Sequence, residues 1–219
     1  MNAYIFNLSG ITLHALPTGA LWAPDSGTLT VSDLHLGKSD RIARRRGIML
    51  PPYETRATLD KLDTLLDTLM PQRVVCLGDS FDDLDAANSL DEVEKMQLAR
   101  QQAGRDWIWI EGNHDPGPVD LGGQHLSELP DCPLIYRHIA IPGTKGEISG
   151  HYHPKCSVSR GGARPAFLID AARVILPAFG AFTGGLRASH PALQSLMQPD
   201  ATAVLTGKRA MPVPLAATF

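Results

Sequence analysis

The sequence predicts an α/β fold built around a parallel sheet, because helical and strand-like segments alternate through the middle of the chain. Residues 54–70 carry leucines at helical spacing and stop at Pro71, a pattern typical of an amphipathic helix. Residues 73–77 and 107–110 are short apolar runs, typical of strands that are covered on both faces. We therefore expect the functional loops at the carboxyl ends of these strands, where open α/β sheets carry their sites.

A second helix is predicted between the two apolar runs. Ser89 and Glu92 have the spacing of a capping box, and Gly104 is a typical stop for a helix that ends near Ala103. This helix completes the alternation of strands and helices that a parallel sheet requires.

Shorter strand-like segments lie on both sides of this central part, separated by glycine and proline. The predicted strands among them are Tyr4–Leu8, Ile11–Leu16, Thr28–Ser32, Leu134–His138, Glu147–Ser149, Ala166–Ile169 and Arg173–Leu176. We expect the later strands to pair with the N-terminal ones in a second sheet. The sequence has no linker, repeat or low-complexity tract, which predicts a single domain over residues 1–219. The proline-rich tail after residue 206 is predicted to be poorly ordered.

The composition is that of a globular protein and excludes several classes. Of 219 residues, 43% are apolar and 20% charged, and the net charge is −3, so the chain is neither disordered nor broadly basic. No apolar run approaches the roughly 18 residues of a membrane helix, and the N-terminus lacks the pattern of a signal peptide. The three unpatterned cysteines, Cys76, Cys132 and Cys156, favour free thiols and a cytoplasmic location.

Four short polar motifs follow strand-like runs. In chain order they are Asp33-x-His35, Gly78-Asp79, Gly112-Asn113-His114-Asp115 and Gly150-His151-Tyr152-His153. In extended backbone, side chains two residues apart point to the same side, so an Asp-x-His or a His-x-His pair can face one ion. Carboxylates mixed with imidazoles, without thiolates, suit Mn²⁺, Fe or Zn²⁺. The candidate ligands are too many for one ion, which predicts two ions about 3.5–4 Å apart that share a carboxylate.

Together, the four motifs resemble those of the calcineurin-like metallophosphoesterases. The resemblance extends to the ligase-associated DNA damage response endonucleases of that superfamily through the segments VSDLHLGK, LGDS, WIEGNHDP, GEISGHYHPK and LPAFGAFTGGL. It covers the chain from about Leu13 to Leu186. The last segment distinguishes these endonucleases from other metallophosphoesterases, which do not carry it. The resemblance implies a two-sheet metallophosphoesterase sandwich flanked by helices. It also implies a two-metal phosphodiesterase or endonuclease that acts on nucleic acid, DNA in particular, in repair.

The resemblance also implies roles for individual residues. The implied metal ligands are Asp33, His35 and His153 for the first ion, Asp79 bridging both ions, and Asn113, His138 and His151 for the second. His138 is assigned by its position, and His125 competes with it, because relatives often read His-Glu-Pro where this chain has His138-Ile139-Ala140. His114 would act beside the leaving group, oriented by Asp115. The ions are expected to be Mn²⁺, with Fe, Zn²⁺ or Mg²⁺ as alternatives.

One acidic cluster departs from the pattern of the relatives. Many of them have a histidine three residues after the bridging aspartate, where this chain has Asp82. Asp82, Asp83 and Asp85 could form an outer shell around the metals, but we expect a solvated acidic turn.

Three basic residues leave two interpretations open. Arg41, Arg44 and Arg45 fall on one face of a helix, close in sequence to the first metal motif. They would either grip a nucleic-acid backbone or form a plain solvated face.

Three functions are compatible with these residues. The first is a two-metal phosphodiesterase that acts on DNA, for which the resemblance implies a functional association with a DNA ligase and a helicase. The second is a metallophosphatase that uses the same site on a small phosphomonoester or nucleotide. The third is a non-catalytic nucleic-acid adaptor, against which the presence of His114 and Asp115 argues. No membrane partner is expected.

Overall fold

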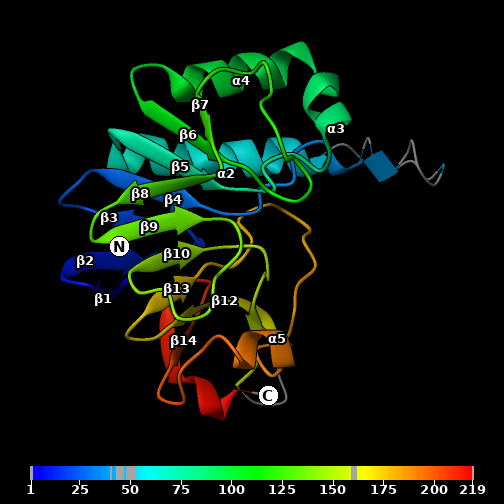
Figure 1. Ribbon diagram of the computed structural model, residues 1–219. Helices are drawn as coiled ribbons and strands as arrows, with labels where there is room; N and C mark the ends of the chain where they lie inside the picture. Colours follow the sequence, from blue (N-terminus) through cyan, green and yellow to red (C-terminus); the bar gives the residue numbers. More distant parts are fainter. Residues whose placement is uncertain (1, 40, 43–46, 48–52, 159–161, 219) are drawn as a thin grey trace.

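The computed structural model describes residues 2–39, 41–42, 47, 53–158 and 162–218, which form two packed sheets with helices on the outside (Figure 1). The first sheet contains, in spatial order, β1 (Tyr4–Leu8), β2 (Ile11–Ala15), β3 (Leu21–Ala23), β4 (Thr28–Val31), β5 (Arg73–Leu77), β6 (Asp106–Ile110) and β7 (Gln124–Leu126). Strands β1 to β4 are antiparallel neighbours, whereas β4 to β7 are parallel. The predicted α/β fold with a central parallel sheet is confirmed.

The second sheet is built from the later part of the chain. Its spatial order is β15 (Met211–Pro214), β14 (Thr202–Leu205), β12 (Arg164–Ile169), β13 (Arg173–Ile175), β10 (Glu147–Ser149), β9 (Leu134–Arg137) and β8 (Glu128–Asp131), with β11 (Lys155–Cys156) beside β12. The prediction that these strands pair with the N-terminal ones is wrong. Short hairpin turns place β1, β2 and β3 successively next to β4, so they extend the first sheet instead.

Helices cover the outer face of the first sheet (Figure 1). The helices are α2 (Tyr53–Leu69), α3 (Leu84–Ser89) and α4 (Glu92–Gln102), while α5 (Pro191–Gln194) and the 3₁₀ turn η1 (Leu215–Ala217) lie near the second sheet. Helix α2 matches its prediction, but α3 was not predicted. The capping box of α4 is Asp91 with Glu94, not Ser89 with Glu92: the Asp91 carboxylate accepts from the Glu94 backbone N–H at 2.8 Å. Ser89 is instead the last residue of α3.

The central strands bury both faces, as their apolar runs predict. In β6, Trp107 and Trp109 pack into the core beneath the helices, while Ile108 and Ile110 pack into the core between the sheets. The inter-sheet core also receives Phe167 from the second sheet. This shared core supports a single domain over residues 1–219, which stays a prediction.

The proline-rich tail after residue 206, for which poor order is predicted, carries strand β15 and the 3₁₀ turn η1. Strand β15 pairs with β14, with Pro212 opposite Val204 and Pro214 opposite Thr202. Because β15 is the edge strand, its prolines can point their missing N–H groups away from the sheet. Among the described residues, no helix combines the length and apolar character needed to cross a bilayer.

Candidate metal centre

Loops at one edge of the two sheets bring the predicted metal ligands together. Strands β4, β5 and β6 are parallel and in register, so the loops that carry Asp33, Asp79 and Asn113 leave the first sheet at the same edge. In the second sheet, His138 directly follows β9, and His151 lies two residues after the parallel strand β10. The site therefore lies where the two sheets meet at one edge, and both sheets contribute residues to it.

Many of these ligands lie in strained backbone. In the described part of the chain, the non-glycine residues with positive φ are Ser9, Asp33, His35, Met70, Asp79, His151, His153 and Phe182. Five of these eight are predicted metal ligands. Side chains disfavour this conformation, and residues held in it cluster at functional sites. The orientation of these ligand side chains is thus set by tight turns rather than by regular strands or helices.

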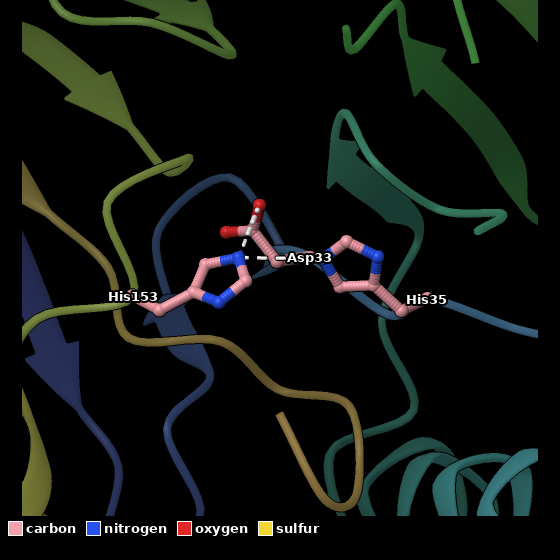
Figure 2. A group of neighbouring side chains, drawn as sticks. All are labelled: Asp33, His35 and His153. Carbon is pink, nitrogen blue, oxygen red and sulfur yellow. Dashed lines mark hydrogen bonds and ion pairs between the residues drawn. The ribbon is translucent and has the colours of Figure 1, made fainter. Parts of the chain in front are cut away.

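The first group of donors is Asp33, His35 and His153, whose ligand atoms lie within 4.8 Å of one another. Figure 2 shows the Asp33 carboxylate facing the His153 ring, with His35 on its other side. His153 Nε2 lies 3.1 Å from Asp33 Oδ1 and 3.3 Å from His35 Nε2. Burial alone would raise the pKa of Asp33, but the hydrogen bond and charge of His153 outweigh it and lower that pKa. Asp33 is therefore an ionised, buried acceptor.

The second group is Asp79, His138 and His151, with Asn113 beside them. His138 Nε2 lies 3.4 Å from Asp79 Oδ2, 3.1 Å from His151 Nδ1 and 3.1 Å from Asn113 Oδ1. Burial would raise the pKa of Asp79, but His138 and the backbone N–H of His114 hold it well below its usual value. Burial would lower the pKa of His138, but Asp79 and Asp33 raise it.

The donor sets fit divalent cations. The Leu77 carbonyl can only accept, so His138 Nδ1 donates to it at 2.8 Å, and in its neutral form the ring presents a lone pair on Nε2. That lone pair faces the Asn113 carbonyl oxygen and a His151 nitrogen, both of which are themselves cation ligands. Around an ion with bonds of about 2.1 Å, neighbouring ligands lie roughly 3.0–3.4 Å apart. The separations of 3.1 to 3.4 Å in both groups match this spacing.

Two glycines are needed to bring the loops this close. A side chain at Gly112 would collide with the backbone and carboxylate of Asp79, and one at Gly150 would collide with Ser32 and the Asp33 carboxylate. The Ser32 hydroxyl also donates to Asp33 Oδ2. Sequence reasoning missed Ser32, although its place directly before the Asp-x-His motif is the signal that could have revealed it.

A family model of the calcineurin-like phosphoesterases matches residues 28–164, which include both donor groups. The chain belongs to the calcineurin-like phosphoesterases. It is a metal-dependent phosphoesterase, since members of this family use divalent metal ions and the chain clusters the corresponding donors.

A solved structure extends the likeness beyond the matched region. The crystal structure of the nuclease MPE from Pseudomonas putida superposes with a TM-score of 0.79 at 28% sequence identity, and the match covers 97% of this chain and 100% of that one. No curated protein sequence matches the chain significantly.

In this phosphoesterase, His114 and Asp115 do not form the predicted pair. The Asp115 carboxylate instead accepts four backbone N–H groups, from Asp79 at 3.0 Å, Ser80 at 2.7 Å, Phe81 at 3.1 Å and Gly112 at 2.9 Å. Asp115 therefore ties the β5 loop to the β6 loop and does not orient His114. Burial, with a smaller contribution from the charge of Asp79, raises the pKa of Asp115 to about 6.

His114 is oriented by a different partner. Its Nδ1 donates to the backbone carbonyl of Asp82 at 2.8 Å, which leaves Nε2 available. Its ring meets His35 edge-on, with the centroids 5.2 Å apart. The half-buried His114 thus stands beside the first donor group, as expected for a residue next to the reacting phosphate.

The expectation of a solvated acidic turn at residues 82–85 is wrong for Asp82. Asp82 is 1% exposed, accepts from His35 Nδ1 at 2.9 Å and is paired with Arg41. Burial would raise its pKa, but His35 and Arg41 lower it. Asp83 caps the N-terminus of α3 by accepting from Ala86 N. Asp82 thus supports His35 from behind, as carboxylates commonly do for metal-ligating histidines.

The remaining predicted residues are the three arginines and His125. Arg41 is paired with Asp82, while Arg44 and Arg45 lie outside the described residues. His125 stacks on Trp109 with the ring centroids 6.3 Å apart and belongs to none of the donor groups. Geometry thus favours His138 over His125.

Proposed function

We propose that this phosphoesterase is a two-metal phosphodiesterase that cleaves nucleic acid, with DNA as its substrate. The observation that carries the proposal is the pair of adjoining donor groups at one edge of the fold. His151 links them, because its ring faces His138 in the second group while its backbone N–H donates to Asp33 of the first at 3.0 Å. The nuclease from Pseudomonas putida, similar over nearly the whole chain, supports a nucleic-acid substrate.

Each ligand has an expected place in the two-metal site. Asp33, His35 and His153 would hold one ion, Asn113, His138 and His151 the other, and Asp79 would bridge them. When bound, the ions supply Lewis acidity, which neutralises phosphate oxygens and lowers the pKa of a coordinated water.

The side chains of the protein supply orientation and a proton. The Asp82 carboxylate fixes the His35 ring so that Nε2 faces Asp33 and His153. His114 Nδ1 is held by the Asp82 carbonyl, so Nε2 is the atom that would donate a proton to the departing oxygen. Asp115 keeps the two loops that carry Asp79 and Asn113 in register.

The setting that we propose is DNA repair in the cytoplasm, with Mn²⁺ as the ion and a DNA ligase and a helicase as functional associates. The resemblance of LPAFGAFTGGL to the ligase-associated endonucleases supports the repair role. Free thiols at Cys76, Cys132 and Cys156 support the reducing compartment.

The test compares Mn²⁺-dependent turnover of bis-p-nitrophenyl phosphate with that of p-nitrophenyl phosphate. We expect a higher kcat/KM for the diester, and cleavage of DNA oligonucleotides by the same preparation. A preference for the monoester would favour a phosphatase of small phosphate esters. DNA binding without turnover of any ester would favour the adaptor.

His138→Ala and His125→Ala form a matched pair that tests the ligand assignment. We expect His138→Ala to lose one ion by metal analysis and most of its turnover. His125→Ala should keep both ions, because His125 lies away from the donor groups. The reverse result would transfer the ligand role to His125.

A further inference from the structure

The loop that follows β13 runs along the edge that carries the metal centre, on the way to α5 (Figure 1). Near its start, Gly180 N donates to the Asp33 carbonyl at 3.2 Å, and at its end Leu186 N donates to the Tyr152 carbonyl at 3.1 Å. Phe182 lies between these anchors. Because two residues of chain reach at most about 7 Å, the Phe182 backbone lies within roughly 10 Å of the Asp33 carbonyl.

Phe182 combines strain with exposure. It is 82% exposed, more than any other large hydrophobic residue among those described. Its φ is +55°, which is unfavourable for a bulky side chain. Besides the five ligands, two other non-glycine residues of the described chain share positive φ, and both have ordinary reasons: Ser9 turns the β1–β2 hairpin and Met70 follows the end of α2. Phe182 also lies in a turn, but positive φ in a turn favours glycine or asparagine, and here the position holds a bulky aromatic residue.

Hydrogen bonds fix this backbone while the ring stays in solvent. Lys38 Nζ donates to the Phe182 carbonyl at 3.1 Å, and Lys155 Nζ donates to the Thr183 carbonyl at 3.0 Å. The Thr183 hydroxyl closes the turn by donating to Gly180 O at 3.3 Å. Each ammonium group has three donors and therefore retains capacity for a phosphate. The protein thus holds an exposed aromatic ring in strained backbone, with two ammonium groups bonded to the carbonyls of residues 182 and 183 and the metal centre close by.

We infer that Phe182 stacks on an unpaired nucleobase adjacent to the scissile phosphate, so that the substrate is nucleic acid with an unpaired base at that position. The inference rests on the proposed function and specifies its substrate. Aromatic side chains bind bases of any sequence through their π-faces, and positive groups beside them attract the backbone. In a duplex, neighbouring base pairs cover these faces, so an exposed ring selects single strands, flaps or frayed ends.

The experiment uses the full chain with Mn²⁺ and measures kcat/KM on a single-stranded oligonucleotide and on bis-p-nitrophenyl phosphate. Phe182→Ala and Phe182→Leu should lower the ratio of oligonucleotide to small-diester kcat/KM by about 5- to 150-fold, the range for loss of one stacked base. Phe182→Trp should preserve the ratio, since it keeps an aromatic face. Ile5→Ala, which removes an exposed apolar side chain from the edge strand β1, is the matched control and should leave the ratio unchanged.

Abasic substitution separates stacking from other losses. The base is removed at each position around the cleaved bond in turn. At one position, its removal should lower the kcat/KM of wild type by the same factor as the Phe182→Ala substitution does on the intact oligonucleotide. At that position, its removal should not lower the kcat/KM of Phe182→Ala any further. A 2-aminopurine at that position should be quenched by wild type and not by Phe182→Ala. An unchanged ratio in Phe182→Ala, or a preference for intact duplex, would overturn the inference and leave the phosphodiesterase standing. Failure of wild type to cleave either substrate would overturn both.

Discussion

Among the side chains that support the metal centre, Asp115 is the one for which the effect of a substitution on stability can best be calculated. Its Oδ1 accepts from Asp79 N and Gly112 N, and its Oδ2 accepts from Ser80 N and Phe81 N. In Asp115→Asn, one end of the new amide presents N–H groups to two of these donors. Hydrogen bonds to a charged acceptor are worth about 1.5–3 kcal/mol each, so we expect the free energy of unfolding to fall by about 3 kcal/mol or more.

The same substitution should weaken metal binding, because Asp115 holds the loop of Asp79 against the loop of Asn113. Loss of a supporting interaction behind metal ligands typically costs about 10–100-fold in affinity. The assay is urea denaturation at pH 7.5 with and without chelator, together with Mn²⁺ titration calorimetry and kcat at saturating Mn²⁺. Burial raises the pKa of Asp115 to about 6, so at pH 7.5 its carboxyl is mainly ionised.

Asp170→Asn is the matched control. Asp170 is also buried and accepts from Ala172 N, Arg173 N and Gln198 N. It lies in the β12–β13 hairpin, at the amino end of β13 and thus at the edge opposite the metal centre. We expect it to lower stability without changing metal affinity. A loss of about 100-fold in kcat for Asp115→Asn, with normal stability and metal affinity, would instead restore Asp115 as the group that orients His114 and refute this reasoning.

Three further predictions concern single residues. Asp79→Ala should lose both ions by metal analysis, and a variant that still binds two would contradict the bridging role. His114→Ala should keep both ions and lose about 10²–10⁴ in kcat, so a near-normal rate would remove it from the leaving group. Burial lowers the pKa of Lys61 to about 8, so the unfolded chain binds more protons than the native chain from pH 8 to about 10.4. As the pH rises over that interval, the free energy of unfolding of wild type relative to Lys61→Met should therefore increase, by at most about 3 kcal/mol in urea denaturation. A difference that does not change with pH would show that the Lys61 ammonium is hydrated in the native chain.

The central strands could be predicted because a strand that is buried on both faces needs an unbroken run of apolar residues, as in β5 and β6. Edge strands leave no such trace. Strand β8 alternates exposed and half-buried residues and contains Pro130, and β7 contains three residues of which one is exposed. Their pairing depends on the position of the neighbouring strand, which local sequence does not encode. For the same reason the partner of the N-terminal hairpins was predicted wrongly.

The ligands could be predicted because metal chemistry limits which residue types serve, and their spacing is regular. Their supports could not. Asp115 follows His114 directly, which suggests a pair, yet its carboxylate turns to the backbone of another loop. Asp82 sits in a cluster of acids that is typical of a solvated turn, and only the fold reveals that it is buried against His35 and Arg41.

Both donor groups draw ligands from both sheets, and this determines how the site is held. Asp33 and His35 come from the first sheet and meet His153 from the second, while Asp79 meets His138 and His151 in the same way. The inter-sheet core fixes the distance between the sheets, and the strained turns then aim each side chain across the gap. A bound cation at either position would join the two sheets at this edge, so metal affinity and sheet packing are thermodynamically coupled. Substitutions in that core are therefore expected to alter metal binding without touching a ligand.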